Sequence, residues 1–205
     1  HDLCRRQRQM CIRDSHKMEY RGYDSAGIAL HQKDQIAHSR TLGKVKLLEE
    51  KMIAEKPKSK LGIAHTRWAT HGEPSEENAH PHKSNERVYI VHNGIIENYL
   101  DLKEFLKDEG YSFSSQTDSE LIAHLLEYFL SKGNSMVDSM YLTKEKLDGA
   151  YAIAAIDREN DQNIVIARSK SPLLIGIGTD EFLAASDPLA IGQLTNEFIF
   201  LEDGD

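Results

Sequence analysis

Two short apolar runs in this chain each lead into a polar segment, and this pattern constrains its fold more than any other feature. Residues 61–65 lead into TRWATHG at 66–72, and residues 88–91 lead into HNG at 92–94. Apolar, partly β-branched runs of this length are typical of strands. Polar side chains placed where strands end can converge on a site, so both segments are candidates for one.

The remaining periodicity predicts an α+β fold with two sheets and helices packed outside them. The pattern Thr117-Asp118-Ser119-Glu120 is typical of a capping box and predicts a helix to about Leu130. After Val91, the residues Ile95-Ile96-Glu97 lead into a second predicted helix. The other expected elements are helices at 45–54, 97–109 and 135–147 and strands at 25–30, 150–156, 164–167, 173–177, 182–185 and 198–201.

Bulk properties exclude several classes of protein. The chain has 205 residues and a formal net charge of −8, which argues against nucleic-acid binding. No apolar stretch approaches the roughly 20 residues of a membrane span, so no membrane partner is expected. Both cysteines, Cys4 and Cys11, lie close to the start, which is not a disulfide framework. A reducing compartment, and therefore the cytoplasm, is expected.

The first fifteen residues, HDLCRRQRQMCIRDS, differ from the rest of the chain. They are rich in arginine, show almost no apolar periodicity and contain both cysteines. We expect residues 1–15 to be a non-native segment and 16–205 to form one domain. The end of the chain directly follows a predicted strand, which suggests a cut within a longer protein.

Several polar residues suit amide hydrolysis, and each also has an ordinary structural interpretation. Arg67 can grip a carboxylate with two parallel hydrogen bonds, or it can be a surface arginine. Thr70 and His71 can add donors to the same carboxylate, although His71 can equally be a loop histidine. Trp68 is the only tryptophan. It is either a core anchor or a wall over the site.

Asn93, Gly94 and Asp118 complete the candidate set. Asn-Gly is a strong hairpin-turn signal, but the Asn93 amide and the Gly94 N–H can also stabilise an oxyanion. Asp118 either supports a helix start or pairs with a substrate ammonium. The histidines around His80-Pro81-His82 lack a neighbouring cysteine and an HExxH spacing, so neither a metal nor another cofactor is expected.

Taken in order, the motifs RGYDSAG at 21–27, HTRWATHGEPSEENAHPH at 65–82, VHNGIIEN at 91–98 and TDSE at 117–120 are specific. Together with GAYA at 149–152, SPLLIGIG at 171–178 and FIFLEDGD at 198–205, they resemble one family. It is the glutaminase domain of glutamine–fructose-6-phosphate aminotransferases, which are class II amidotransferases with an N-terminal nucleophile. The resemblance runs from about residue 19 to residue 205.

The resemblance implies a four-layer αββα fold with two antiparallel sheets between helices, whose first strand is missing or replaced here. It implies that Arg67, Thr70 and His71 hold the α-carboxylate of L-glutamine, and that Asp118, with Gly94, holds the α-ammonium. Asn93 and Gly94 would form the oxyanion hole. By the same resemblance, Trp68 would close the site and gate ammonia passage, and Arg21 would lie near the nucleophile.

The resemblance also implies partners and an activity for a longer protein. Ammonia would pass to a C-terminal sugar isomerase module, absent here, that makes glucosamine 6-phosphate from fructose 6-phosphate. The full-length enzyme would be a homodimer.

The chain departs from the family pattern at its start. The family nucleophile is an N-terminal cysteine followed by a strand and a helix, whereas nine residues separate Cys11 from Arg21. A strand of about five residues and a helix of about eleven do not fit between them. We therefore expect the chain as written to lack its nucleophile and to be inactive. The alternatives are a nucleophile-free glutamine-binding or regulatory module, and another class II amidotransferase.

Overall fold

The computed structural model describes residues 23–205 except 56, 58 and 69–71. Its helices are α2 (Val45–Glu55), α3 (Tyr99–Asp108), α4 (Glu120–Ser131), α5 (Met136–Lys144) and α6 (Pro188–Ile191). Its strands are β1 (Ser25–Gln32), β2 (Gln35–Leu42), β3 (Gly62–Arg67), β4 (His82–Ser84), β5 (Val88–Ile96), β6 (Gly149–Asp157), β7 (Asn160–Ser169), β8 (Leu174–Gly178), β9 (Glu181–Ala185) and β10 (Phe198–Phe200).

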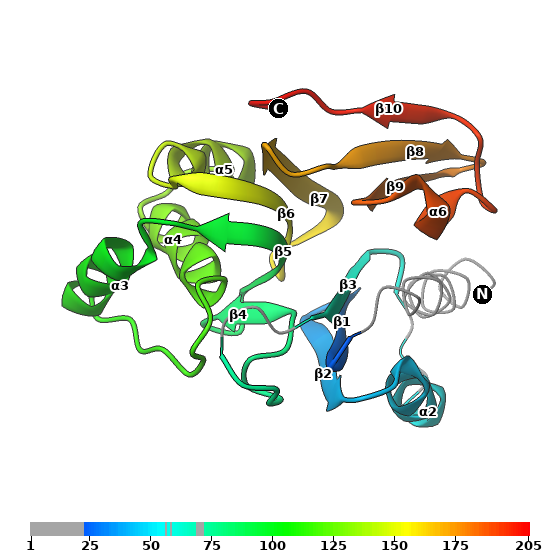
Figure 1. Cartoon of the computed structure of the whole chain (residues 1–205), viewed down its shortest axis with the longest axis horizontal. Coiled ribbons are helices and arrows are strands. Elements are labelled where there is room, and N and C mark those ends of the chain that lie inside the picture. Colours follow the sequence, from blue (N-terminus) through cyan, green and yellow to red (C-terminus); the bar gives the residue numbers. More distant parts are fainter. Residues whose placement is uncertain (1–22, 56, 58, 69–71) are drawn as a thin grey trace.

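The first two layers are α2 and the antiparallel sheet β2-β1-β3 (Figure 1). Side chains alternate between the two faces of a strand, so one face of β1 carries Ala26, Ile28 and Leu30. These residues are buried against Val45, Leu48 and Met52, which lie at helical spacing on α2. Burial of this apolar contact holds the helix on the sheet.

The second sheet, β4-β5-β6-β7, lies against the opposite face of the first. Ala29 and Ile63 of the first sheet share a buried cluster with Tyr89 and Ile156 of the second. The two sheets therefore pack face to face, and polar side chains on these inner faces are directed into the space between them.

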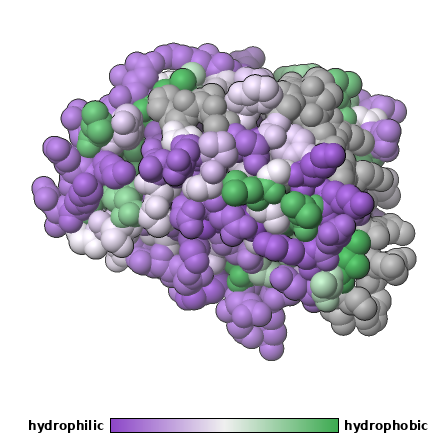
Figure 2. Space-filling model, turned by 60° about the horizontal axis from the view of Figure 1, so that its bottom comes forward, coloured by the Kyte–Doolittle hydropathy of each residue, from purple (hydrophilic) through white to green (hydrophobic). Residues whose placement is uncertain are grey.

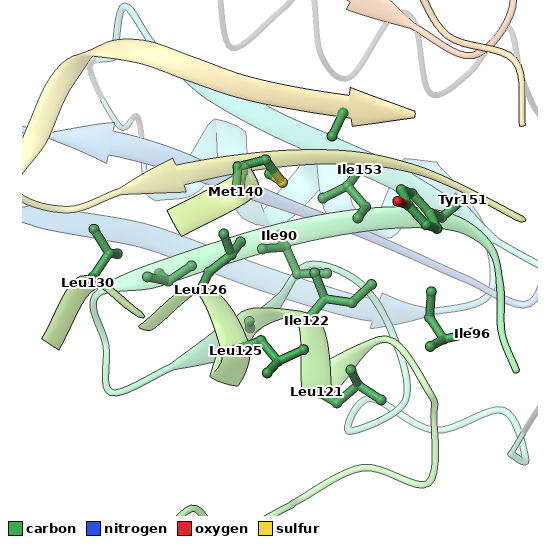
Figure 3. Packing of buried hydrophobic residues seen from close by; sticks show 14 of the residues in the cluster. Ile90, Ile96, Leu121, Ile122, Leu125, Leu126, Leu130, Met140, Tyr151 and Ile153 are labelled. Carbon is green, nitrogen blue, oxygen red and sulfur yellow. The ribbon is translucent and has the colours of Figure 1, made fainter. Parts of the chain in front are cut away.

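The fourth layer consists of helices α3, α4 and α5 on the outer face of the second sheet. Figure 3 shows Leu121, Ile122, Leu125 and Leu126 of α4 packed beneath Ile90 and other buried side chains of the sheet. The α+β class and the four-layer αββα order are thus confirmed. The predicted absence or replacement of the first strand concerns residues before Tyr23, which lie outside the described part of the chain.

A third small antiparallel sheet, β10-β8-β9, follows these layers and packs with α6 around Leu174, Leu183 and Ile191. Hydrophilic side chains cover most of the molecular face in Figure 2, and hydrophobic side chains form small separate groups on it. Among the described residues, no helix combines the length and apolarity that a membrane span needs.

Two local predictions were wrong. The strand predicted to end at Val91 continues as β5 through Ile96, and the helix predicted from residue 97 begins only at Tyr99, as α3. The capping box does not form: the Thr117 hydroxyl contacts His82, the Thr117 N–H donates to the Ser115 hydroxyl, and Glu120 accepts hydrogen bonds from the backbone N–H groups of Ser114 and Ser115. In addition, β2 and β4 were not predicted.

Candidate active site

The site lies between the two sheets, where His65 of β3 contacts Asn93 of β5. On β3, His65 and Arg67 alternate with Ala64 and Thr66, and Ala64 packs toward α2. Residues two apart on a strand share a face, so His65 and Arg67 are both directed toward the second sheet. Gly27 of β1 lies opposite His65 in the ladder.

Arg67 is buried, with 5% of its surface exposed, so the interpretation as a surface arginine was wrong. Its Nη1 atom lies 3.4 Å from Oδ1 of Asp24, and its Nη2 atom donates to the carbonyl of Gly72 at 3.2 Å. The backbone N–H of Asp24 also donates to the Arg67 carbonyl at 2.8 Å. These contacts fix the direction of the guanidinium, and they join the end of β3 to Gly72 and to Asp24.

Asn93 and Gly94 lie inside β5 and pair with Ala152 and Tyr151 of β6, so the hairpin-turn interpretation was wrong. Glycine is required at residue 94 for two reasons. Its φ angle is +134°, and a Cβ atom added there would lie 1.9 Å from the carbonyl oxygen of Ala150. The turn-like dipeptide thus serves a close approach of two strands.

The N–H of Gly94 is directed away from β6. In an antiparallel ladder, successive N–H groups point to opposite edges. Glu97 donates to the carbonyl of Asp148 on the β6 side, whereas Ile96 donates in the opposite direction to Oδ2 of Asp118 at 2.8 Å. Gly94 lies two residues before Ile96 in an unbroken register and therefore shares its direction.

The Asn93 side chain lies on the inner face of β5 and is exposed. Its Oδ1 atom lies 2.8 Å from Nε2 of His65. The site thus has a side-chain amide and a backbone N–H next to each other inside β5, and a buried guanidinium at the end of β3 in the facing sheet.

Four histidines gather behind these groups. The ring of His80 lies 4.3 Å from that of His65 and 4.6 Å from that of His82. His92 contacts the Ser119 hydroxyl at 2.8 Å through Nδ1. Burial lowers the pKa of all four imidazoles, to about 3 for His82 and about 4 for His92. They are therefore neutral at physiological pH.

The other predicted residues divide into two groups. Trp68 directly follows β3 with 64% of its surface exposed, so it is not a core anchor. Thr70, His71, Arg21, Cys4 and Cys11 lie outside the described residues. Within the described part of the chain, no group of three or more His, Cys, Asp or Glu side chains is arranged to hold a metal ion.

Sequence reasoning assigned no role to Asp24 or His65. The signal for His65 was its spacing of two residues from Arg67 on a predicted strand, which places both side chains on one face. No comparable local signal exists for Asp24, because its contact with Arg67 depends on the pairing of β1 with β3.

Comparisons with known proteins agree with the resemblance found in the sequence. Residues 65–193 match the family described as "Glutamine amidotransferase domain". Because this match covers more than half of the chain, the chain belongs to the glutamine amidotransferase family.

The similar curated proteins specify a particular kind of amidotransferase. The chain is 50% identical over 199 residues to the glutamine–fructose-6-phosphate aminotransferase (isomerizing) of Haemophilus influenzae, which covers 96% of this chain and 32% of that protein. It is 51% identical over 191 residues to the enzyme of the same name from Haemophilus ducreyi, covering 93% and 31%. The chain therefore spans about a third of the length of these relatives.

Solved structures confirm the fold. The glutamine phosphoribosylpyrophosphate amidotransferase of B. subtilis superposes with a TM-score of 0.81 at 25% sequence identity, covering 96% of this chain and 43% of that one. A structure described as the allosteric regulatory enzyme of purine biosynthesis gives a TM-score of 0.82 at 26% identity, with the same coverage.

Proposed function

We propose that this chain is the glutamine-hydrolysing domain of a glutamine–fructose-6-phosphate aminotransferase. The observation that carries the proposal is the pair of neighbouring residues Asn93 and Gly94 in β5, which the Asn93–His65 contact joins to β3 of the facing sheet, where Arg67 carries a buried guanidinium. The identity of about 50% to enzymes of that name supports fructose 6-phosphate as the acceptor of the ammonia, rather than the acceptors of other amidotransferases.

The proposed chemistry requires groups that hold both ends of glutamine. A guanidinium binds a carboxylate through parallel hydrogen bonds, so Arg67 is assigned the α-carboxylate. Thr70 and His71, which the structure does not describe, are proposed as further donors to it. Asp118 is assigned the α-ammonium, because its carboxylate is held next to β5 by Ile96.

The side-chain amide then lies toward Asn93 and Gly94. Attack of a thiolate on the amide carbon places negative charge on the amide oxygen, and preorganised N–H donors stabilise that charge. The N–H of Gly94 points away from the β5–β6 ladder, and the Asn93 amide lies next to it. Collapse of the tetrahedral intermediate releases ammonia, and water then releases glutamate from the thioester. We assign Trp68, exposed directly after β3, to closing the site.

The whole protein's activity follows as a proposal from its relatives. Ammonia would be transferred to a sugar isomerase module outside this chain to form glucosamine 6-phosphate, within a homodimer. We infer that this chain as written lacks a usable nucleophile. A nucleophile-free glutamine-binding module is the alternative.

Glutamate release from glutamine tests the proposal in two proteins. One is the chain as written, and the other carries a Cys-first strand and helix in place of residues 1–15. We expect activity only in the second protein. Equal activity in both would show that Cys4 or Cys11 serves as the nucleophile. Glutamine binding without hydrolysis in both would favour a binding module, and absence of binding in both would overturn the proposal.

A further inference from the structure

The hydrogen bond between His65 and Asn93 joins the two sheets at the site. We propose that His65 is a positioning residue that fixes the orientation of the Asn93 side-chain amide, so that its NH2 group is directed toward the reacting amide of the substrate. This inference rests on the proposed function, in which Asn93 is an oxyanion donor. His65 itself acts through Asn93 and does not touch the substrate.

The surroundings of His65 select its tautomer. Its Nδ1 atom is buried and has no hydrogen-bond partner among the described residues. A proton on Nδ1 would create an orphaned buried N–H group, which is rare in proteins. Burial also lowers the pKa of His65, which excludes the imidazolium at neutral pH. The proton therefore lies on Nε2, and Nε2 donates to the atom 2.8 Å away, Oδ1 of Asn93.

An amide that accepts at Oδ1 must present its NH2 group on the other side. Amide groups are planar, and their oxygen and nitrogen atoms exchange places only by a half-turn of χ2. Asn93 is exposed, and no other hydrogen bond of its side chain is found among the described residues. Without His65, both orientations become accessible, and one of them turns a carbonyl oxygen toward the developing oxyanion.

His65 is itself held in place by an unusual packing arrangement. Gly27 lies opposite it in the β1–β3 ladder, and a Cβ atom at Gly27 would lie 2.0 Å from the carbonyl oxygen of His80. The absence of a side chain at Gly27 lets the backbone of His80 lie on β1. The His80 ring then packs at 4.3 Å against the His65 ring. A series of contacts, from Gly27 to His80, from His80 to His65 and from His65 to Asn93, thus connects the first sheet to the side-chain amide of Asn93.

The test begins with the chain as written, labelled with 15N for NMR of its histidine rings and asparagine side chains. We expect His65 at pH 7 to be neutral and protonated at Nε2. In His65→Phe, which keeps a ring beside His80 but removes the donor, the Asn93 NH2 resonances should shift and their hydrogen exchange should accelerate. His65→Gln, which retains an N–H donor, should restore part of the wild-type spectrum.

A matched control separates positioning from general loss of a buried histidine. His38 on β2 makes a comparable hydrogen bond, from Nε2 to the carbonyl of Pro81 at 3.0 Å, and packs on Tyr89. His38→Phe should leave the Asn93 resonances unchanged. A proton on Nδ1 of wild-type His65, an imidazolium at pH 7, or an unaltered Asn93 amide in His65→Phe would each overturn the inference. The wild-type measurement of the His65 tautomer tests the inference even if a variant fails to fold.

Kinetics give a second readout in the version of the protein that hydrolyses glutamine. His65→Phe should lower kcat by about 10- to 100-fold with little change in KM, since losing a whole oxyanion donor costs about 100- to 1000-fold. His65→Gln should recover part of kcat. Equal losses of kcat in His65→Phe and His38→Phe would overturn the positioning role. If no version is active, the proposed function fails, and the NMR result still decides the orientation of Asn93.

Discussion

The Asp118 carboxylate accepts a hydrogen bond from the backbone N–H of Ile96 at 2.8 Å. This contact joins the segment before α4 to β5 two residues beyond Gly94. It holds the carboxylate of Asp118, a residue with 7% of its surface exposed, beside the proposed substrate position. Asp118 therefore combines a structural hydrogen bond with its proposed charge interaction, and substitutions can separate the two.

Asp118→Asn should weaken glutamine binding while largely preserving the fold. Asparagine keeps an oxygen for the Ile96 N–H but loses the charge that would pair with the α-ammonium. A hydrogen bond to a charged group contributes about 1.5–3 kcal/mol, so we expect affinity to fall by about 10- to 100-fold, as measured by calorimetry. Asp118→Ala should in addition lower the free energy of unfolding by about 1–3 kcal/mol. Wild-type affinity in Asp118→Asn would contradict the assignment of the ammonium.

Gly94→Ala should prevent normal pairing of β5 with β6. The added methyl group would meet the Ala150 carbonyl oxygen at 1.9 Å, and the φ angle of +134° is unfavourable for alanine. We expect a loss of several kcal/mol in urea unfolding, or failure to fold. Gly110→Ala is the control, because Gly110 also has a positive φ of +93° but open space around it. It should cost only about 1 kcal/mol, and a similar loss in both variants would show that the close approach is unimportant.

The layers of the fold could be predicted from sequence because apolar periodicity determines them. The spacing of Val45, Leu48 and Met52 predicted α2, and the apolar runs predicted β3 and the start of β5. By contrast, β2 reads QIAHSRTL and is mostly polar, so it gave no apolar signal. It forms because all eight of its residues pair with β1 across a two-residue hairpin loop, so the apolar β1 determines its conformation.

The candidate site could be predicted only in part. Arg67, Asn93, Gly94 and Asp118 were found because they follow apolar runs or begin a helix. Two local rules gave wrong results there, since Asn93-Gly94 is not a turn and the residues 117–120 do not form a capping box. At Asn93-Gly94 the pairing with the distant strand β6 outweighed the local preference, and at 117–120 the donors of the nearby Ser114 and Ser115 did so. Such exceptions are common at functional sites.

Acidification should destabilise the chain below about pH 6.5. Burial lowers the pKa of His38 and His92 to about 4 and that of His82 to about 3. In the unfolded chain these groups titrate near 6.5. Between pH 6.5 and 4 the unfolded state therefore binds more protons than the folded state, and stability decreases as the pH is lowered. Each group should cost about 2 kcal/mol at pH 5. Urea unfolding at pH 7, 6 and 5 measures this loss.

The histidine origin of this loss can be isolated by removing one group. His38→Phe deletes a titrating side chain and retains the ring contact with Tyr89. Its stability at pH 7 will be lower than that of the wild type, but the further loss between pH 7 and 5 should be smaller by about 2 kcal/mol. Stability that stays constant from pH 7 to 5 in the wild-type chain would contradict this prediction.

Glu120 should stabilise the chain in a different pH range. Its carboxylate accepts hydrogen bonds from the backbone N–H groups and the hydroxyl groups of Ser114 and Ser115, at 2.6–3.1 Å. Burial alone would raise the pKa of Glu120. The nearby His124 imidazole and the donors of both serines outweigh this effect and hold the pKa well below its usual range. A lowered pKa stabilises the folded state above about pH 4.5.

Glu120→Gln should therefore cost about 2–3 kcal/mol at pH 7, because charge-assisted hydrogen bonds are lost and an NH2 group faces N–H donors. The difference from wild type should shrink as the pH falls below about 4.5, where the unfolded wild-type chain gains a proton. Glu104→Gln, at an exposed residue of α3, should change stability by less than about 0.5 kcal/mol. Equal stability of Glu120→Gln and the wild type at pH 7 would mean that the serine donors are satisfied as well by a neutral amide.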